Sequence, residues 1–384
     1  MSNTQKIILF FLGIGILVFC VLILGTLSQV WEQPLGPALN LPTNTYLPAA
    51  TFPPTYTPIP KEFLQPGHPL TGTPESPTAT PATALCGGPP VMTLLAIGSD
   101  QRIDSYLYGL GDVIRLVRVD FVTPRVTMMY FPRDLYVEIP GISDHYDITH
   151  GKLNQSYLYG NPGFGYYDGT DLGPGLMART LAHNFGAQPD HYIAVNMRTF
   201  ENIVDAVGGI TVTLPQTIDG RAANQPDRKD LVFYAGTHNL TGKQALQLAR
   251  LRPYGTIQRS NAQNDILCGL YDRLLSPKIV GDIPELIRAF EDNIQTDLSP
   301  AEISQLSCLL TQLNGSNISF LHFPDNFFTL ARVDDPVLGN TSIFDADFNL
   351  IRDYVTAFSQ GSWLGTDIQV PSTNQTSSAR SFCE

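Results

Sequence analysis

The longest uninterrupted apolar stretch of the chain lies at its N-terminus. Residues 7–31 contain no charged side chain and are mostly apolar. As a helix rising about 1.5 Å per residue, this stretch would reach roughly 37 Å, more than the roughly 30 Å of a bilayer hydrocarbon core. A signal peptide has a shorter apolar core of about 7–15 residues. The pattern therefore predicts an uncleaved transmembrane signal anchor, with a cleaved signal peptide as the alternative.

The charges that flank this stretch predict its orientation. Lys6 precedes it, and Glu32 is the first charged residue after it. Because positive charge is retained on the cytoplasmic side of a membrane, we expect residues 1–6 in the cytoplasm. The rest of the chain beyond the span is then extracytoplasmic.

The segment 32–86 has a different composition. Thirteen of the 30 prolines fall between Pro34 and Pro81, interleaved with threonine and serine. Proline fixes φ and lacks an N–H, so such a segment makes neither a sheet nor a long helix. It is predicted to be an extended spacer, a Pro/Thr-rich stalk between the membrane and a folded module at 87–384.

Residues 87–384 alternate between short apolar runs and segments with helical spacing. The runs predict strands, and the spacing with Gly stops predicts helices. Strands are expected at 91–97, 113–119, 126–131, 135–139, 191–195, 210–214 and 318–323, and helices at 175–186, 197–207, 243–249, 259–275, 284–293 and 300–313. Strands alternating with helices indicate a layered α/β domain with one sheet.

Composition excludes several classes of protein. The 23 Lys and Arg against 35 Asp and Glu give a net charge of −12, which argues against a nucleic-acid partner because that needs a basic surface. The apolar fraction of 43 % is too high for a disordered chain. Only 15 % of the residues are charged, against about 25 % in an average soluble domain, so each charged cluster carries more information.

The cysteines suggest two disulfides. Cys20 lies in the predicted span, and the other four lie in the part placed outside the cell, where disulfides form. Cys86 and Cys383 stand at the two ends of the module, which are often close in folded domains. Cys268 and Cys308 each lie in a predicted amphipathic helix. These positions predict the pairs Cys86–Cys383 and Cys268–Cys308, with four buried free thiols as the alternative.

Charged side chains gather at the ends of predicted strands. Asp100 and Arg102 follow the first strand, Asp112 opens the second, and Arg133 and Asp134 follow the third. Polar groups at strand ends of α/β sheets often form sites. Two carboxylates at adjacent strand ends suit a divalent cation such as Mg²⁺ or Mn²⁺, which prefers oxygen ligands.

A second group of cations lies further along the chain. Arg250 and Arg252 share a face if the chain is extended there, and Arg259 and Gln263 share a helix face. Several arginines in an acidic protein indicate an anionic ligand such as a phosphate or pyrophosphate. Each motif alone is also typical of a surface turn, an ion pair or a solvated strand. Only their order and spacing together indicate a site.

The combined pattern resembles the LytR-CpsA-Psr family of membrane-anchored, extracytoplasmic bacterial phosphotransferases. The resemblance runs from about residue 91 to 275, with a weaker part to about 370. It rests on GSDQR after the first strand, Asp112 twelve residues after Asp100, FPRD followed by LYVEIPG, the run Lys152-Leu153-Asn154, DHYIAVNMRTFENIVDAVGGITV, LTGKQALQLARLR, and Arg259 with Gln263.

The resemblance implies a layered α-β-α module with a central mixed sheet, and transfer of a glycopolymer from a polyprenyl-pyrophosphate carrier to peptidoglycan through a phosphodiester. Asp100 and Asp112 would bind Mg²⁺, and the lipid would enter an apolar tunnel. Either Asp100 or Asp134 would act as the base. The residues expected at the pyrophosphate are Arg133, Arg250, Arg252, Arg259 and Gln263, assisted by Arg102 and Lys152.

Two departures from the family pattern D-x-x-R-x-x-R-Q concern this pyrophosphate site. Thr256 replaces the first acidic residue and Ala262 the second arginine. The expected site therefore has one cation fewer. This keeps open the alternative of a non-catalytic protein that binds polyprenyl phosphates or wall glycans. A lipid pyrophosphatase without an acceptor is a further alternative.

Overall fold

The computed structural model describes residues 31–41, 83–103, 105–222, 224–251, 256–276, 294–362 and 383. The predicted span at 7–31, apart from Trp31, lies outside these residues, as do the predicted helix at 284–293 and Arg252. Within the described ranges, no helix is long and apolar enough to cross a membrane.

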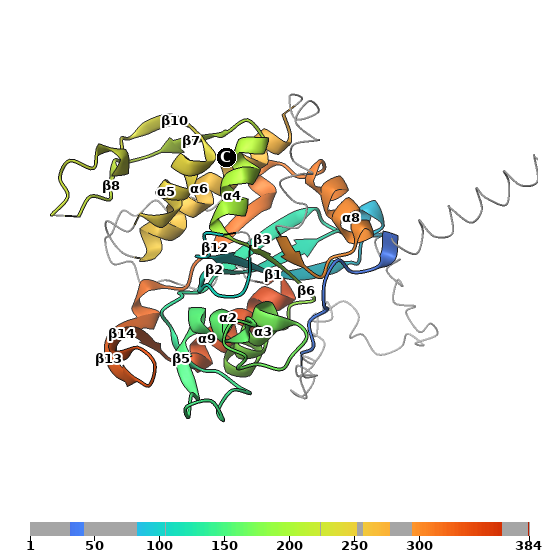
Figure 1. The fold of residues 1–384 in the computed structure, drawn as a ribbon. Coiled ribbons are helices and arrows are strands. Elements are labelled where there is room, and N and C mark those ends of the chain that lie inside the picture. The colour runs from blue at the N-terminus through green and yellow to red at the C-terminus, as the bar shows by residue number, and fades with distance from the viewer. Residues whose placement is uncertain are drawn as a thin grey trace, which may run out of the picture. The chain divides into compact units, whose positions relative to one another are not determined.

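A mixed sheet forms the centre of the fold (Figure 1). Its six strands are ordered β11-β6-β1-β2-β3-β12. In that order they comprise Ile294–Thr296, His191–Val195, Val91–Ser99, Gly111–Asp120, Arg125–Tyr130 and Ile318–Leu321. β1 is parallel to β6 and β12 to β3, whereas the other neighbours are antiparallel. The prediction of a layered fold around a central mixed sheet is confirmed.

The side chains of β2 show how the sheet separates two environments. Ile114 and Leu116 are buried in the largest hydrophobic cluster on one face. Val113, Arg115 and Val117 line a cavity on the other. This follows from the two-residue period of a strand, in which successive side chains point to opposite faces.

Three helices cover the first face: α2 (Leu153–Gly160), α3 (Leu172–Phe185) and α9 (Phe348–Gln360) (Figure 1). Their packing is aromatic in part, since Phe131 at the end of β3 stacks on Phe185 of α3 with ring centroids 5.7 Å apart. α3 ends at Gly186, in the left-handed conformation (φ 73°), as its predicted stop requires. The sequence did not reveal α2, because it is buried nearly all round and shows no amphipathic pattern.

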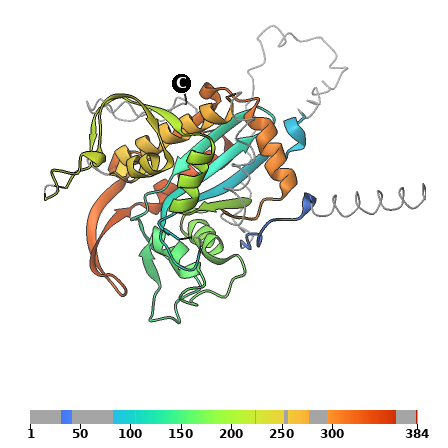
Figure 2. The same cartoon turned by 45° about the horizontal axis from the view of Figure 1, so that its top comes forward.

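Among the described residues, the helices on the second face are α4 (Met197–Ala206), α5 (Gly242–Arg250), α6 (Thr256–Leu274) and α8 (Pro300–Leu310) (Figure 2). Asn196 caps α4 by accepting the N–H of Thr199. Thr241 and Gln244 form a capping box at the start of α5. α4 and α5 approach each other closely at Gly242, where a longer side chain would collide with the backbone of Glu201.

The prediction of one sheet was wrong, because the described part of the chain contains four two-stranded sheets besides the central one. The strands predicted at 135–139 and 210–214 lie in these small sheets. Their partners were missed, since segments such as HGK and GTHNL carry no apolar alternation. The pairs are β4 (Tyr136–Glu138) with β5 (His150–Lys152), β7 (Ile210–Leu214) with β10 (Gly236–Leu240), β8 (Ile218–Asp219) with β9 (Val232–Phe233), and β13 (Phe328–Asp335) with β14 (Gly339–Ala346).

Both predicted disulfides are wrong in their pairing, and the alternative of four free thiols is wrong as well. Cys86 bonds to Cys308 in α8, and Cys268 in α6 bonds to Cys383, with Cα atoms 5.8 and 5.2 Å apart. The two terminal cysteines lie against different helices: Cys86 against α8 and Cys383 against α6. The N–H of Cys383 also donates to the carbonyl of Gly315. Each helix is therefore fastened to one end of the module, not to the other helix.

Residues 35–41, which we call the N-terminal strap, lie on the module. The N–H of Leu35 donates to the carbonyl of Leu298 at 3.1 Å. The N–H groups of Leu39 and Asn40 donate to the carboxylates of Asp297 and Asp171 at 3.4 and 3.0 Å. The strap was predicted as part of the spacer, but it belongs to the same compact unit as residues 84–384, and the separate unit is 42–83.

Candidate active site

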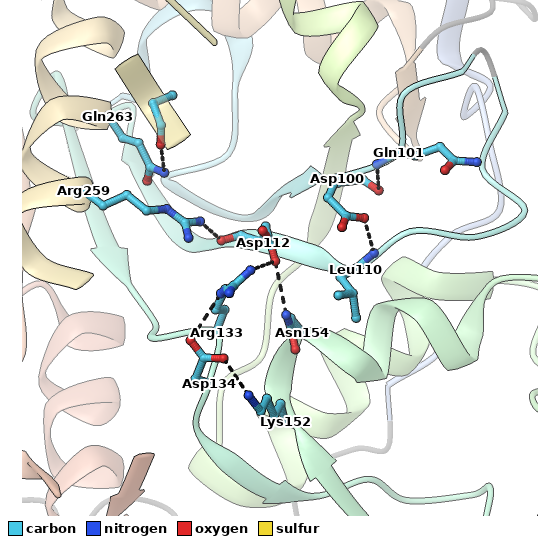
Figure 3. Close-up of polar contacts among 12 residues, drawn as sticks. Asp100, Gln101, Leu110, Asp112, Arg133, Asp134, Lys152, Asn154, Arg259 and Gln263 are labelled. Carbon is cyan, nitrogen blue, oxygen red and sulfur yellow. Dashed lines mark hydrogen bonds and ion pairs between the residues drawn. The ribbon is translucent and has the colours of Figure 1, made fainter. Parts of the chain in front are cut away.

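Two carboxylates stand at the same end of the central sheet, on the connection between β1 and β2 (Figure 3). Asp100 follows the last residue of β1, and Asp112 is the second residue of β2. The intervening loop is closed at its base, because Asp100 and Leu110 exchange backbone and side-chain hydrogen bonds of 3.0 and 2.7 Å. This closure brings together the two acids that the sequence placed at adjacent strand ends.

A chain of ion pairs runs from Asp112 into the first face of the sheet (Figure 3). Arg133 donates to Asp112 at 2.5 Å and to Asp134 at 3.2 Å. Lys152 donates to the other oxygen of Asp134 at 3.2 Å. All four side chains are less than a quarter exposed, so their charges are screened by solvent less than those of surface pairs.

The start of α2 holds this chain in place. The N–H of Asn154 donates to the carbonyl of Arg133 at 3.1 Å, and the Asn154 side chain donates to Asp112 at 3.2 Å. The N–H of Leu153 also donates to the carbonyl of Leu135. Asn154 was noted in the sequence only as part of a family motif, and the structure places it in contact with Asp112.

The pKa values of Asp100 and Asp112 are shifted in opposite directions. Burial is the largest influence on the pKa of Asp100 and raises it; the N–H of Leu110 lowers it, and the charge of Asp112 raises it, leaving it above its ordinary value. Burial also acts to raise the pKa of Asp112, but the hydrogen bond and charge of Arg133 outweigh it and leave this pKa below its ordinary value. Asp112 is therefore held as a carboxylate, and Asp100 is the more basic of the pair.

Helix α6 contributes from the second face of the sheet. Arg259 is buried and donates to the backbone carbonyl of Asp112. Gln263, one turn later, donates to the carbonyl of Ala249 at 3.2 Å and so joins α6 to the end of α5. Arg250, the last residue of α5, is exposed and borders the same cavity as Arg259 and Gln263.

The remaining predicted residues are less closely connected. Arg102 is exposed and borders a separate surface hollow together with Asp100. Arg252 lies outside the described residues. The structure therefore brings Asp112, Arg133, Asp134 and Lys152 into one network, attaches Arg259 to it, and leaves Arg102 at the border.

A cavity of about 560 Å³ opens beside this network, between the sheet and helices α4, α5 and α6. Its walls are mainly apolar, with contributions from Ile97, Val117, Phe200 and Ile266. Asp112 and Arg259 also border it. An apolar chamber with charged groups at one end suits a ligand that has an apolar chain and an anionic head.

The acids fit a magnesium ion only in combination with other oxygen ligands. No group of three or more Asp, Glu, His or Cys residues suited to a metal occurs in the part of the chain that the structure describes. Asp100 and Asp112 are nevertheless close enough for the charge of one to raise the pKa of the other. Magnesium is commonly held by one or two carboxylates, with water and substrate phosphates completing its shell.

Sequence reasoning missed three polar residues around the cavity. Arg115 lies in the middle of β2, where it donates to Asn264 at 2.8 Å and to Gln263 at 3.4 Å. Asn264 in turn contacts His322 at 3.3 Å. The signal was present as a charged residue inside the apolar run VIRLV, but a strand with one solvated face gives the same pattern.

The fold and site define a class of α/β proteins in which a carboxylate–arginine network adjoins an apolar chamber beside the sheet. This chain belongs to the LytR_cpsA_psr family, which it matches over residues 89–355. The family predicted from the sequence is thereby confirmed.

One of two curated relatives carries a name connected with the cell wall, and the other is named as a regulatory protein. The chain is 31 % identical over 228 residues to the polyisoprenyl-teichoic acid–peptidoglycan teichoic acid transferase TagU of Oceanobacillus iheyensis, covering 59 % of this chain and 63 % of that protein. It is 25 % identical over 218 residues to the regulatory protein MsrR of Staphylococcus aureus, covering 56 % and 58 %. The match therefore spans less than two thirds of each relative.

Solved structures share the fold. The crystal structure of B. subtilis TagV aligns with a TM-score of 0.53 at 22 % identity, covering 71 % of this chain and 97 % of that one. Protein gbs0355 from Streptococcus agalactiae aligns with a TM-score of 0.52 at 23 % identity, covering 69 % and 88 %.

Proposed function

We propose that this protein is a membrane-anchored, extracytoplasmic phosphotransferase that moves a glycopolymer from a polyprenyl-pyrophosphate carrier to peptidoglycan. One observation carries the proposal: the network of Asp112, Arg133 and Arg259 lies beside an apolar cavity of about 560 Å³. The lipid chain fits the cavity, and its pyrophosphate fits the charged end. The name of the O. iheyensis relative supports the same class of reaction.

In this reaction a hydroxyl oxygen of the acceptor attacks the phosphorus that carries the glycan. The new P–O bond forms as the anhydride bond to the lipid phosphate breaks, so polyprenyl phosphate leaves and a glycan phosphodiester remains. Catalysis of phosphoryl transfer consists largely of positioning and charge stabilisation. The partly exposed Arg133 and the buried Arg259 both contact Asp112 and would hold the phosphoryl oxygens.

The hydroxyl proton needs an acceptor, and the contacts favour Asp100 over Asp134. Asp134 is held by ion pairs to both Arg133 and Lys152. Asp100 has no ion pair among the described contacts, so the acceptor hydroxyl can approach it without displacing a guanidinium or an ammonium group. Asp134 then serves to hold Arg133 and Lys152 in position.

Asp100 and Asp112 would hold Mg²⁺, with Mn²⁺ as a substitute, together with oxygen atoms of the substrate. The ion would supply charge neutralisation at the pyrophosphate. Residues 7–31 would anchor the protein as a signal anchor with a cytoplasmic N-terminus. The two disulfides support an extracytoplasmic module, since disulfides persist in oxidising compartments.

The test uses the full-length chain in detergent with Mg²⁺, chitobiose linked to farnesyl pyrophosphate as donor, and purified peptidoglycan glycan strands as acceptor. Mass spectrometry should show the glycan phosphate on the acceptor and an equal amount of free farnesyl phosphate. Farnesyl phosphate released without glycan on the acceptor would instead identify a pyrophosphatase. Donor binding without turnover would identify a binding protein, and either result would overturn the proposal.

A further inference from the structure

Arg115 is a charged residue in a place where charge is costly. Arg115 comes three residues after Asp112 along β2 and is only 3 % exposed. Its guanidinium donates to the side-chain oxygens of Asn264 and Gln263 and lies over the rings of Tyr130 and Phe320, 5.7 and 5.9 Å from their centroids. All four partners are uncharged groups.

No carboxylate among the described residues forms an ion pair with Arg115. In the same part of the chain, its Nε atom has no hydrogen-bond partner. Burial lowers its pKa to about 10, which still leaves it protonated at neutral pH. A buried charge without a counter-ion is unfavourable unless something else pairs with it.

The surroundings add positive charge instead of removing it. Arg259 is also buried, and its charge acts to lower the pKa of Arg115. His322, which contacts Asn264, has a pKa lowered to about 4 by burial and by Arg115. It is therefore neutral at pH 7 and cannot serve as a counter-ion. The counter-ion of Arg115 must therefore come from outside the described residues.

The cavity gives such a counter-ion access, because Arg115, Arg259 and Gln263 all border it. Gln263 lies one helical turn after Arg259 on α6. Because the Arg115 guanidinium contacts Gln263, it lies about one turn further along this helix than Arg259 does. Two buried cations thus follow one another along the same wall. This spacing suits two linked anionic groups or one anion held between both arginines.

We propose that Arg115 binds the phosphate attached to the lipid, the leaving group of the transfer reaction. The inference rests on the proposed function and deepens it. Arg259 and Arg133 then face the phosphoryl group that is transferred, and Arg115 faces the phosphate that stays on the isoprenoid. Negative charge grows on that phosphate as the anhydride bond breaks, and a preorganised buried cation stabilises it. The leaving group also remains anionic as product, so Arg115 favours retention of polyprenyl phosphate.

The test compares the binding of farnesyl phosphate with that of farnesol to the full-length chain in detergent. Three variants separate charge from shape: Arg115→Met removes the charge, Arg115→Lys keeps it, and Asn264→Asp places a carboxylate against Arg115. The matched control is Arg118→Met, which removes a guanidinium that is paired with Asp120 on the same strand. Arg118 is not among the residues that line this cavity.

The wild type and Arg118→Met should bind farnesyl phosphate more tightly than farnesol. Arg115→Met and Asn264→Asp should lose roughly tenfold to a hundredfold in affinity for farnesyl phosphate, the usual value of a charge-assisted hydrogen bond, with little change for farnesol. Arg115→Lys should recover part of the loss. Should Arg115→Met fail to fold, Asn264→Asp still decides, since it adds a counter-ion and leaves Arg115 in place.

Two negative results have different meanings. If the wild type prefers farnesyl phosphate and both Arg115→Met and Asn264→Asp keep that preference, Arg115 is not the phosphate site and only this inference fails. If the wild type shows no preference for farnesyl phosphate over farnesol, the proposed function fails and this inference fails with it.

Discussion

The two faces of the central sheet are built by different means. One is covered by α2, α3 and α9 and filled by a single continuous cluster in which Leu116, Phe131 and Phe185 are fully or almost fully buried. The other carries three smaller clusters around the cavity. Both disulfides fasten helices of this second face. The first face is thus stabilised mainly by apolar packing. The second face, where the cavity interrupts the packing, is stabilised in addition by the two disulfides.

The largest expected effect concerns the charged end of the cavity. Asp112→Asn and Arg133→Ala should each reduce transfer by roughly a hundredfold or more, because they remove charge from the site of phosphoryl transfer. Transfer rates with the farnesyl-linked donor measure this. The matched control is Asp120→Asn at the other end of β2, which also loses an arginine ion pair. Equal losses in all three variants would contradict the assignment of the site.

Matched leucines should reveal the difference between the faces. Leu116→Ala, in the continuous cluster, should lower the free energy of unfolding by about 3 kcal/mol, since it leaves a cavity in close-packed surroundings. Leu246→Ala, on the cavity wall, should cost only about 1 kcal/mol, because fewer contacts are lost. Chemical denaturation of both variants measures the difference. Equal costs would show that the two faces are packed alike.

Removal of one disulfide should affect the second face specifically. The paired change Cys268→Ser with Cys383→Ser should lower the free energy of unfolding by about 2–4 kcal/mol, because the unfolded chain regains the freedom of a long loop. Denaturation in the absence of reductant measures this cost.

Intact mass should rise by about four daltons on full reduction of the wild type, two per disulfide. No mass change would refute both bonds.

Acid should weaken the second face through His322. Burial and Arg115 lower its pKa to about 4 in the folded protein, against about 6.5 when unfolded. The unfolded state then binds more protons, so the free energy of unfolding falls as the pH drops from about 6.5 to 4, by up to about 3 kcal/mol. His322→Gln should remove this part of the acid sensitivity, measured by denaturation at pH 7 and pH 4.5. An unchanged difference between the two pH values would exclude His322.

The central sheet and the charged network were predictable because their signals are local. Apolar runs marked five of the six described central strands, all except β11, and scarce charges at strand ends marked Asp100, Asp112 and Arg133. Arg115 escaped notice because a charged residue within a strand usually faces water, and only the packing of α6 shows otherwise. The disulfide pairing failed for the same reason: it depends on which helix each terminus reaches in three dimensions.

The N-terminal strap decides where the folded protein begins. Residues 35–41 belong to the same compact unit as residues 84–384, so the folded module includes residues that precede 42–83 in the chain. A recombinant version that starts at residue 84 would remove the N–H donors that Leu39 and Asn40 supply to Asp297 and Asp171, two almost fully buried carboxylates. Tyr192 and Tyr167 would still donate to Asp297 and Asp171, but one oxygen of each buried carboxylate would lose its backbone donor, which is costly. A recombinant form that begins near residue 32 and keeps the natural chain from there onward would retain them.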